Sequence, residues 1–373
     1  MLLMGLLLLL GGILSLQAQS PELPRCIDRP GTVTLPRINY NYYCLETITQ
    51  TEVGRPFAYT ALAFAPDGTL YATRPLQGQL IALTDANGDG LPESEQVLLD
   101  GLTTPNALYM AEDGLYIAGG PHIYRYADSE LSTLVDNLPN GTGYWTGGIA
   151  VHADHIYVGI AVNCDNCQPD ADRGVILSYA RDGSDRQIVA TGLHQPVALT
   201  VFQGEIWFTD IMPPDDPHYP QDEINRLIIG ADYGYPACSG ECEPPVIPIQ
   251  AGYAPLSLLA YTGEAFPNLE GQLLALFAGA ERTAALRGPD LVGFKVQPES
   301  IMAEALFPYD LSVIKDGPFM IDRTGGYTNP ATNLLNQRGA GFWPFRLYGM
   351  AISPEGWIVF SVSDGRLMAL RTR

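Results

Sequence analysis

The chain has 373 residues, of which 46% are hydrophobic and 16% charged, so it can bury a large core and is neither disordered nor collagen-like. Asp and Glu number 41 against 20 Lys and Arg, which gives a formal net charge of -21 at pH 7. A surface this acidic repels nucleic-acid phosphates and anionic lipid headgroups, so neither is a favoured partner. The only lysines are Lys295 and Lys315, which leaves almost no candidate for Schiff-base chemistry.

The N-terminus has the pattern of an export signal. Residues 2–16 are almost wholly apolar, and Ala18 and Ser20 then supply small residues for a cleavage site. The apolar run suits a signal peptide and is short for a membrane span. We therefore expect residues 1–20 to be a signal peptide, with a retained N-terminal anchor as the alternative. The protein is then periplasmic or extracellular, with no membrane contact beyond such an anchor.

The six cysteines form three local pairs: Cys26 with Cys44, Cys164 with Cys167, and Cys238 with Cys242. An even count in an exported chain favours disulfides. The alternative is a zinc site that takes its four ligands from the last two pairs. An oxidising compartment favours the disulfides.

One unit recurs along the body of the chain: an alternating apolar strand, a tight acidic-Gly or Gly turn, and a second strand with an aromatic residue. The repeats begin at about residues 61, 107, 149, 197, 271 and 350. The first four are about 40 to 50 residues apart, a spacing typical of propeller blades. The pattern predicts an all-β fold, a six-bladed β-propeller of four-stranded antiparallel blades, over residues 51–373. Residues 21–50 are expected to be a separate N-terminal segment, and residues 297–340 an insertion without a clean closing strand.

A candidate calcium loop lies inside the first repeat. Asp85, Asn87 and Asp89, followed by Gly90 and Glu93, place oxygen ligands at alternating positions around a glycine turn. Hard cations such as calcium prefer this set of ligands. The alternative is an ordinary hairpin turn without a metal.

Residues 222–227 read Asp-Glu-Ile-Asn-Arg-Leu and residues 230–236 read Gly-Ala-Asp-Tyr-Gly-Tyr-Pro. These segments resemble the signature of the glucose/sorbosone dehydrogenase family, and weaker matches lie at residues 85–90, 156–167 and 261–267. The resemblance implies an exported six-bladed propeller that binds pyrroloquinoline quinone (PQQ) and calcium and oxidises sugars by hydride transfer to the quinone.

The resemblance also implies where the proton chemistry lies. Tyr144 stands where the family has its catalytic His, and a phenol with a pKa near 10 is a weak base. The Asp that partners this His in some members falls near Val162, which is apolar. His194 is the second candidate for the proton transfer, since it stands at a cofactor-contacting position.

The family's cofactor contacts carry over with changes. His194 and Gln195 replace an Arg and an Asn that contact the quinone, and Tyr253 replaces another His. The basic residues expected at the cofactor are Arg282 and Arg346.

The resemblance further implies two calcium sites. One uses Glu223 with the backbone of Tyr233. The other bridges to the quinone through backbone carbonyls of the loop that contains Met212 and Pro213.

Three functions remain open. The first is a PQQ-dependent sugar dehydrogenase with an altered centre, which passes electrons from a sugar to a carrier. The second is a non-catalytic exported propeller that binds a carbohydrate or a protein. The third is a lactonase-type hydrolase, which needs Glu, Asn and Asp side chains around one axial calcium, and no such set is evident in the sequence.

Overall fold

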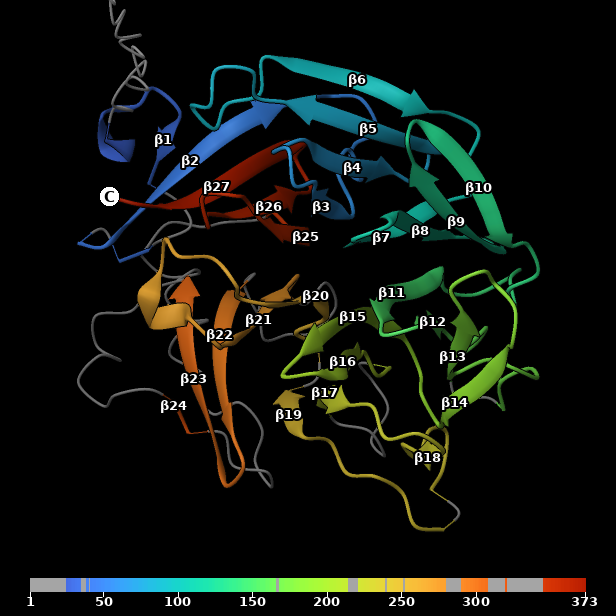
Figure 1. Cartoon of the computed structure of the whole chain (residues 1–373). Coiled ribbons are helices and arrows are strands. Elements are labelled where there is room, and N and C mark those ends of the chain that lie inside the picture. Colours follow the sequence, from blue (N-terminus) through green and yellow to red (C-terminus); the bar gives the residue numbers. More distant parts are fainter. Residues whose placement is uncertain are drawn as a thin grey trace, which may run out of the picture.

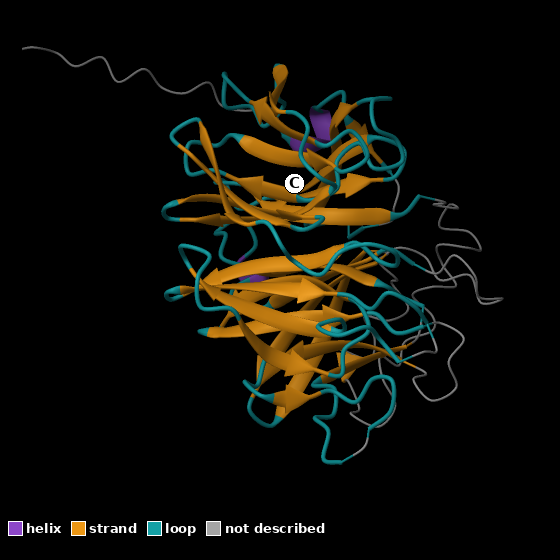
Figure 2. Ribbon diagram, turned by 90° about the vertical axis from the view of Figure 1, so that its right-hand side faces the viewer, coloured by secondary structure: helices purple, strands orange, loops and turns teal. Residues whose placement is uncertain are grey.

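The computed structural model describes residues 25–34, 38–39, 41–165, 168–213, 221–238, 240–250, 252–279, 290–307, 319–320 and 345–373. Its strands form six sheets arranged in a ring around a central axis (Figure 1). Figure 2, turned by 90°, shows that the described part of the chain consists of strands and loops with almost no helix, and its helices are two short 3-10 turns, η1 (Cys26–Asp28) and η2 (Pro267–Leu269). The predicted six-bladed propeller is therefore confirmed.

The strands follow one another around the ring in chain order. The first blade contains β3 (Leu62–Phe64), β4 (Leu70–Arg74), β5 (Gln79–Thr84) and β6 (Ser94–Leu99). The second contains β7 (Pro105–Ala111), β8 (Gly114–Gly119), β9 (His122–Ala127) and β10 (Glu130–Val135). The third contains β11 (Thr146–His152), β12 (His155–Ile160), β13 (Val175–Ala180), β14 (Gln187–Thr191) and β18 (Ala231–Asp232).

The fourth blade contains β15 (Pro196–Phe202), β16 (Glu205–Asp210), β17 (Gln221–Arg226) and β19 (Ile247–Gln250). The fifth contains β20 (Pro255–Ala260), β21 (Leu273–Phe277), β22 (Asp290–Gln297), β23 (Ser300–Phe307) and β24 (Phe319–Met320). The sixth contains β25 (Leu347–Ile352), β26 (Ile358–Val362), β27 (Arg366–Thr372), β2 (Tyr43–Gln50) and β1 (Thr32–Val33). Each blade has the predicted four antiparallel strands, and three blades add a two-residue fifth strand, of which β18 pairs in parallel.

The N-terminal segment closes the ring. β2 pairs antiparallel with β27, so the last blade combines both ends of the described chain (Figure 1). A disulfide between Cys26 and Cys44 joins η1 to β2. The segment before residue 51, expected to be separate, is thus part of the propeller.

The region expected to be an insertion also contributes to a blade. β22 ends at Gln297, and β23 pairs with it as the fourth strand of the fifth blade. Most of the predicted insertion after Phe307 lies outside the described residues, as does the leader at residues 1–20. In the part of the chain that is described, no helix is long and apolar enough to cross a membrane.

The innermost strands pack closely because small residues stand where neighbouring blades meet. A Cβ at Gly147 would collide with the Pro196 carbonyl oxygen, and a Cβ at Gly349 would collide with that of Thr60. These glycines let β11 approach β15 and β25 approach β3. Apolar clusters from adjacent blades fill the space behind them.

A buried charge cluster holds the seam between the first and last blades. The Glu46 side chain is fully buried on β2, with Arg29 Nε 2.8 Å from one carboxylate oxygen and Arg371 Nε 3.0 Å from the other. Arg29 also donates to the Asp89 carbonyl, and Arg371 donates to the Gly90 carbonyl. The two guanidinium groups thus fasten a loop of the first blade to the sixth.

Replacing Glu46 should weaken this seam strongly. Glu46→Gln leaves two buried guanidinium groups without their carboxylate, and breaking a buried pair in this way costs about 3 kcal/mol or more. Urea unfolding should report the loss. Glu52→Gln, which breaks an exposed pair with Arg55, is the matched control and should cost less than about 1 kcal/mol. Equal midpoints for the two variants would contradict this role of the cluster.

Candidate functional site

The antiparallel blades bring distant segments to one face of the ring. Every innermost strand begins at the same face, and every second strand ends there, because the two are antiparallel neighbours. Segments before β11, β15, β20 and β25 therefore meet the segments after β12 and β16. We call this the entry face. By the same alternation, the loop at residues 85–93 lies at the opposite face.

An axial cavity of about 470 Å³ opens within the ring. All six innermost strands line it, with mainly apolar side chains midway along them, among them Leu108, Ile149, Leu199, Leu258 and Met350. Polar and aromatic side chains line it at the entry face, among them Phe57, Tyr144, Trp145, Gln195 and Arg346. Pockets of this volume accept small molecules and cofactors.

The two residues predicted to do the proton chemistry meet at one carboxylate. The Tyr144 hydroxyl donates to Asp165 Oδ1 over 2.9 Å, and His194 Nε2 lies 2.8 Å from the same oxygen. Tyr144 precedes β11, Asp165 follows β12 and His194 precedes β15, so three separate segments build the cluster. The carboxylate sought near Val162 is supplied three residues later.

His194 is the buried member of this cluster. Its side chain is 1% exposed, whereas that of Asp165 is 45% exposed. His194 Nδ1 lies 2.5 Å from the Ile211 carbonyl oxygen, so both ring nitrogens face an acceptor. The rings of Tyr144 and Tyr235 pack edge-on against the imidazole, with centroids 5.3 and 4.9 Å away. Geometry therefore places Tyr144, and not His194, on the cavity wall.

Two fully buried carboxylates hold the segments of the entry face. Asp210 accepts hydrogen bonds from the backbone amides of His194 (3.0 Å) and Gln195 (2.6 Å). Asp222 accepts from the amides of Met212 (3.1 Å) and Ala254 (2.9 Å). Sequence reasoning missed both roles, since an acidic residue at a strand end gives no sign of which amides it will meet.

Burial raises the pKa values of these carboxyl groups and of the neighbouring Glu223. Desolvation raises the pKa of Asp222 to about 7 and that of Glu223 to about 7. It also raises the pKa of Asp210 well above its usual range, and the charge of Glu223, opposite Asp210 in the β16–β17 register, adds to the shift. Burial therefore favours the protonated, neutral form of these three carboxyl groups.

The predicted cofactor residues divide into two groups. Gln195 and Arg346 line the axial cavity, whereas Tyr253 is 2% exposed and packs against Phe277. His194 is one residue from the wall but does not line it. Arg282 lies outside the described residues.

The residues of the two calcium sites implied by the resemblance do not form a cluster of carboxylates in the described part of the chain. Glu223 accepts from Asn225 Nδ2 over 2.9 Å, and the Tyr233 hydroxyl donates to the Arg226 carbonyl. Met212 is buried beside Tyr144, and Pro213 is the last described residue before a gap. Both sites remain predictions.

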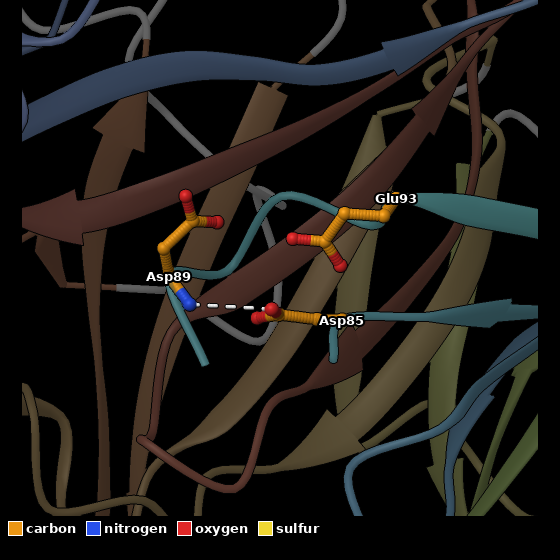
Figure 3. Close-up of side chains that lie close together, drawn as sticks. All are labelled: Asp85, Asp89 and Glu93. Atoms are coloured by element: carbon orange, nitrogen blue, oxygen red, sulfur yellow. Dashed lines mark hydrogen bonds between the residues drawn. The ribbon is translucent and has the colours of Figure 1, made fainter. Parts of the chain in front are cut away.

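The loop between β5 and β6 does gather its ligands. Carboxylate oxygens of Asp85, Asp89 and Glu93 lie within 4.8 Å of one another. Figure 3 shows the three side chains together, with the Asp89 amide donating to Asp85. Asn87 Oδ1 also accepts from this amide, over 2.8 Å. Within the described part of the chain this is the one acidic or His/Cys group that is close enough to hold a metal.

The disulfide prediction is confirmed for the described cysteines. Cys26 bonds Cys44, and Cys238 bonds Cys242. Cys164 is disulfide-bonded as well, while its predicted partner Cys167 lies outside the described residues. No cysteine of the described chain is left free for zinc.

Comparison with known proteins yields relatives in structure only. No protein-family model matches the sequence, and no curated protein matches it significantly. A calcium structure of a Trichoderma reesei protein of carbohydrate-active enzyme family AA12 superposes with a TM-score of 0.65 at 17% identity, covering 95% of this chain and 100% of that one. A PQQ-bound aldose sugar dehydrogenase from Streptomyces coelicolor superposes with a TM-score of 0.56 at 16% identity, covering 88% and 97%.

The fold is that of the soluble aldose and glucose dehydrogenases. A gluconolactonase-like structure also shares it, with a TM-score of 0.52 at 12% identity over 93% of this chain and 97% of that one. At these identities the likeness extends to the fold alone, so activity must be argued from the residues of this chain.

The raised pKa of Glu223 predicts a pH effect on stability. Its carboxyl binds a proton more tightly when folded (pKa about 7) than when unfolded (about 4.5), so its contribution is fully present below pH 4.5 and is lost as pH rises through 7. Glu223→Gln keeps the hydrogen-bonding shape without the charge. In chelator, the variant should gain on the wild type by roughly 2 to 3 kcal/mol between pH 5 and pH 8. Exposed Glu130→Gln is the control, and parallel stability curves for Glu223→Gln and wild type would contradict the assignment.

The loop between β5 and β6 should bind calcium. A ligand bound only by the folded state stabilises it, by about 2.7 kcal/mol at a hundredfold excess over Kd. Millimolar calcium, an order typical of extracellular sites, should raise the melting temperature above that in chelator. Asp85→Asn with Glu93→Gln should abolish this rise, whereas Asp100→Asn in the next loop should not. A rise that persists in the double variant would show that calcium binds elsewhere.

Proposed function

We propose that the protein is an exported PQQ-dependent dehydrogenase of the sugar type, which oxidises an aldose or sorbosone-like sugar at C1 within the entry-face cavity and passes the electrons to a carrier. The observation that carries this proposal is the Tyr144–Asp165–His194 cluster at the wall of an axial cavity. The leader pattern and the disulfides support export. The shared fold with a PQQ-bound dehydrogenase adds support at the level of architecture.

The residues at the entry face fit a flat, anionic cofactor. Phe57 packs against Trp145 and Tyr348, with ring centroids 5.3 and 5.0 Å apart, and all three line the cavity. Aromatic rings suit a planar ligand. Arg346 on the same wall offers a forked, charge-assisted contact to a carboxylate. When bound, the quinone supplies the hydride acceptor.

The remaining residues of the site orient the ligand and exclude water. The side chain of Gln195 presents its amide to the cavity. Its backbone N–H donates to Asp210 Oδ1 over 2.6 Å, which fixes this part of the chain. The apolar walls keep water from the reacting carbon. Met212 packs beside Tyr144, and the backbone carbonyls of Met212 and Pro213 would be the ligands for a calcium ion at the cofactor.

A second candidate function rests on the burial of His194. An imidazole that is 1% exposed and engaged at both nitrogens is typical of a structural residue, which favours a propeller that binds a carbohydrate without oxidising it. The lactonase alternative is disfavoured, because it needs Glu and Asp side chains around an axial calcium and no carboxylate is among the described residues that line the cavity.

Cofactor reconstitution separates these candidates. The purified protein, incubated with PQQ and calcium and then desalted, should retain a quinone absorption band and reduce a dye with an aldose. Arg346→Ala should weaken quinone binding about ten- to a hundredfold, since a charge-assisted contact is worth about 1.5 to 3 kcal/mol. Arg186→Ala, which breaks an exposed pair with Asp172, is the control. Sugar binding without a quinone band would favour the carbohydrate-binding propeller. A protein that binds neither the quinone nor a sugar would overturn both candidate functions.

A further inference from the structure

A second cavity lies between the first and sixth blades, at the face opposite the entry face. Its volume is about 230 Å³, and the β3–β4 turn, the loop between β5 and β6 and the β25–β26 turn form its rim, so we call it the seam cleft. We propose that the seam cleft binds a small organic cation, an amidinium or ammonium group on an apolar body. The inference goes beyond the proposed function, since this cleft lies away from the axial cavity and needs no cofactor.

Apolar side chains form the walls of the seam cleft. Phe64 from the first blade and the partly exposed Trp357 from the sixth both line it. Each rim segment contributes one proline, and the fixed φ of a proline holds the rim in shape without a ligand; these are Pro66, Pro92 and Pro354. An apolar cavity of roughly 150 Å³ accepts a benzene ring. The seam cleft therefore has room for a ring that carries a polar group.

The rim of the seam cleft is negatively charged. Asp67 on the β3–β4 turn and Glu355 on the β25–β26 turn are exposed, and both line the cleft. Among the described residues, no Arg or Lys forms an ion pair with either carboxylate. Asp85 adds a third carboxylate, whose oxygens accept the amides of Gly88 and Gly90. Asp67 and Glu355 are thus the two groups that can pair with a cationic ligand.

Arg371 also lines the seam cleft, but its donors are engaged at the blade seam. One Nη donates to the Gly90 carbonyl over 2.8 Å, and Nε lies 3.0 Å from the buried Glu46 carboxylate. The guanidinium stacks on Trp357, 4.0 Å from the ring centroid, and so holds this ring in the wall. The charges that line the cleft are then three carboxylates against one engaged guanidinium.

The whole opposite face shares this negative charge. The connection between the first two strands of every blade carries or adjoins an exposed acidic residue, and in blade order these include Asp67, Glu112, Asp154, Glu205, Glu264 and Glu355. Charge of one sign around a cleft with apolar walls raises the local concentration of the opposite ion. This arrangement favours a cation over an anion or a neutral molecule of the same shape.

Indole NMR signals test the site directly. The chain has four Trp residues, and Trp357 lines the seam cleft whereas Trp145 lines the axial cavity. Benzamidine titrated into the full protein in chelator should shift the Nε1–H signal of Trp357, which Trp357→Phe identifies, and should leave that of Trp145 in place. Benzamide, a neutral molecule of nearly the same shape, should shift neither signal at the same concentration. Chelator keeps calcium off the loop that carries Asp85.

Substitutions on the rim separate a specific site from the general field of the face. Asp67→Asn with Glu355→Gln should weaken benzamidine binding at least about tenfold, the usual loss for hydrogen bonds to charged groups. Glu112→Gln with Asp154→Asn removes the same charge from turns of the second and third blades, which do not line the cleft. This matched control should leave Kd nearly unchanged at about 0.15 M salt, where distant exposed charges are screened.

Four results would overturn the proposal: an unmoved Trp357 signal at millimolar benzamidine, an equal shift with benzamide, a larger shift at Trp145, or equal weakening in the two double variants. None of these readouts depends on a quinone. The seam cleft and the proposed function can therefore fail separately.

Discussion

The pairing of β2 with β27 is the constraint on which the molecule depends. An incomplete blade would leave an unpaired strand edge where the ring closes. The stability of the ring therefore depends on completing its last blade. Here the first described strands complete the blade that the last strands begin, and the Cys26–Cys44 disulfide and the Arg29–Glu46–Arg371 cluster reinforce that seam. Closure sets the starting ends of all six innermost strands at one face. The segments that carry Tyr144, His194 and Arg346, which are up to about 200 residues apart, become neighbours for that reason.

The entry face is held by charges that are costly to bury. Asp210 and Asp222 lie at the core end of the fourth blade and accept hydrogen bonds from four backbone amides of three segments. Desolvation opposes their ionisation, which is why the pKa of Asp222 rises to about 7 despite those donors. Perturbed carboxylates beside a cavity are typical of functional sites, and this supports the assignment of chemistry to the entry face.

The sequence was sufficient for what depends on local pattern. Alternating strands around acidic-Gly turns predicted the blades, and the spacing of Asp85, Asp89 and Glu93 predicted a loop whose carboxylates do converge. It failed where partners are distant. No pattern in residues 21–50 indicates that β2 will pair with β27. The resemblance put the partner carboxylate near Val162, whereas the structure places Asp165, in the loop after β12, at this position. His194 was expected beside the ligand, but its burial depends on Tyr144, Ile211 and Tyr235, which no local pattern connects.

We propose that the entry face binds a quinone cofactor beside Tyr144 and Arg346. The most direct measurement is a crystal structure of the protein soaked with PQQ and calcium. We expect planar density against Phe57, Trp145 and Tyr348, with a cofactor carboxylate on the Arg346 guanidinium and the Tyr144 hydroxyl facing the space that the sugar would fill. Density for the quinone at the opposite face, or an empty axial cavity at saturating cofactor, would contradict it.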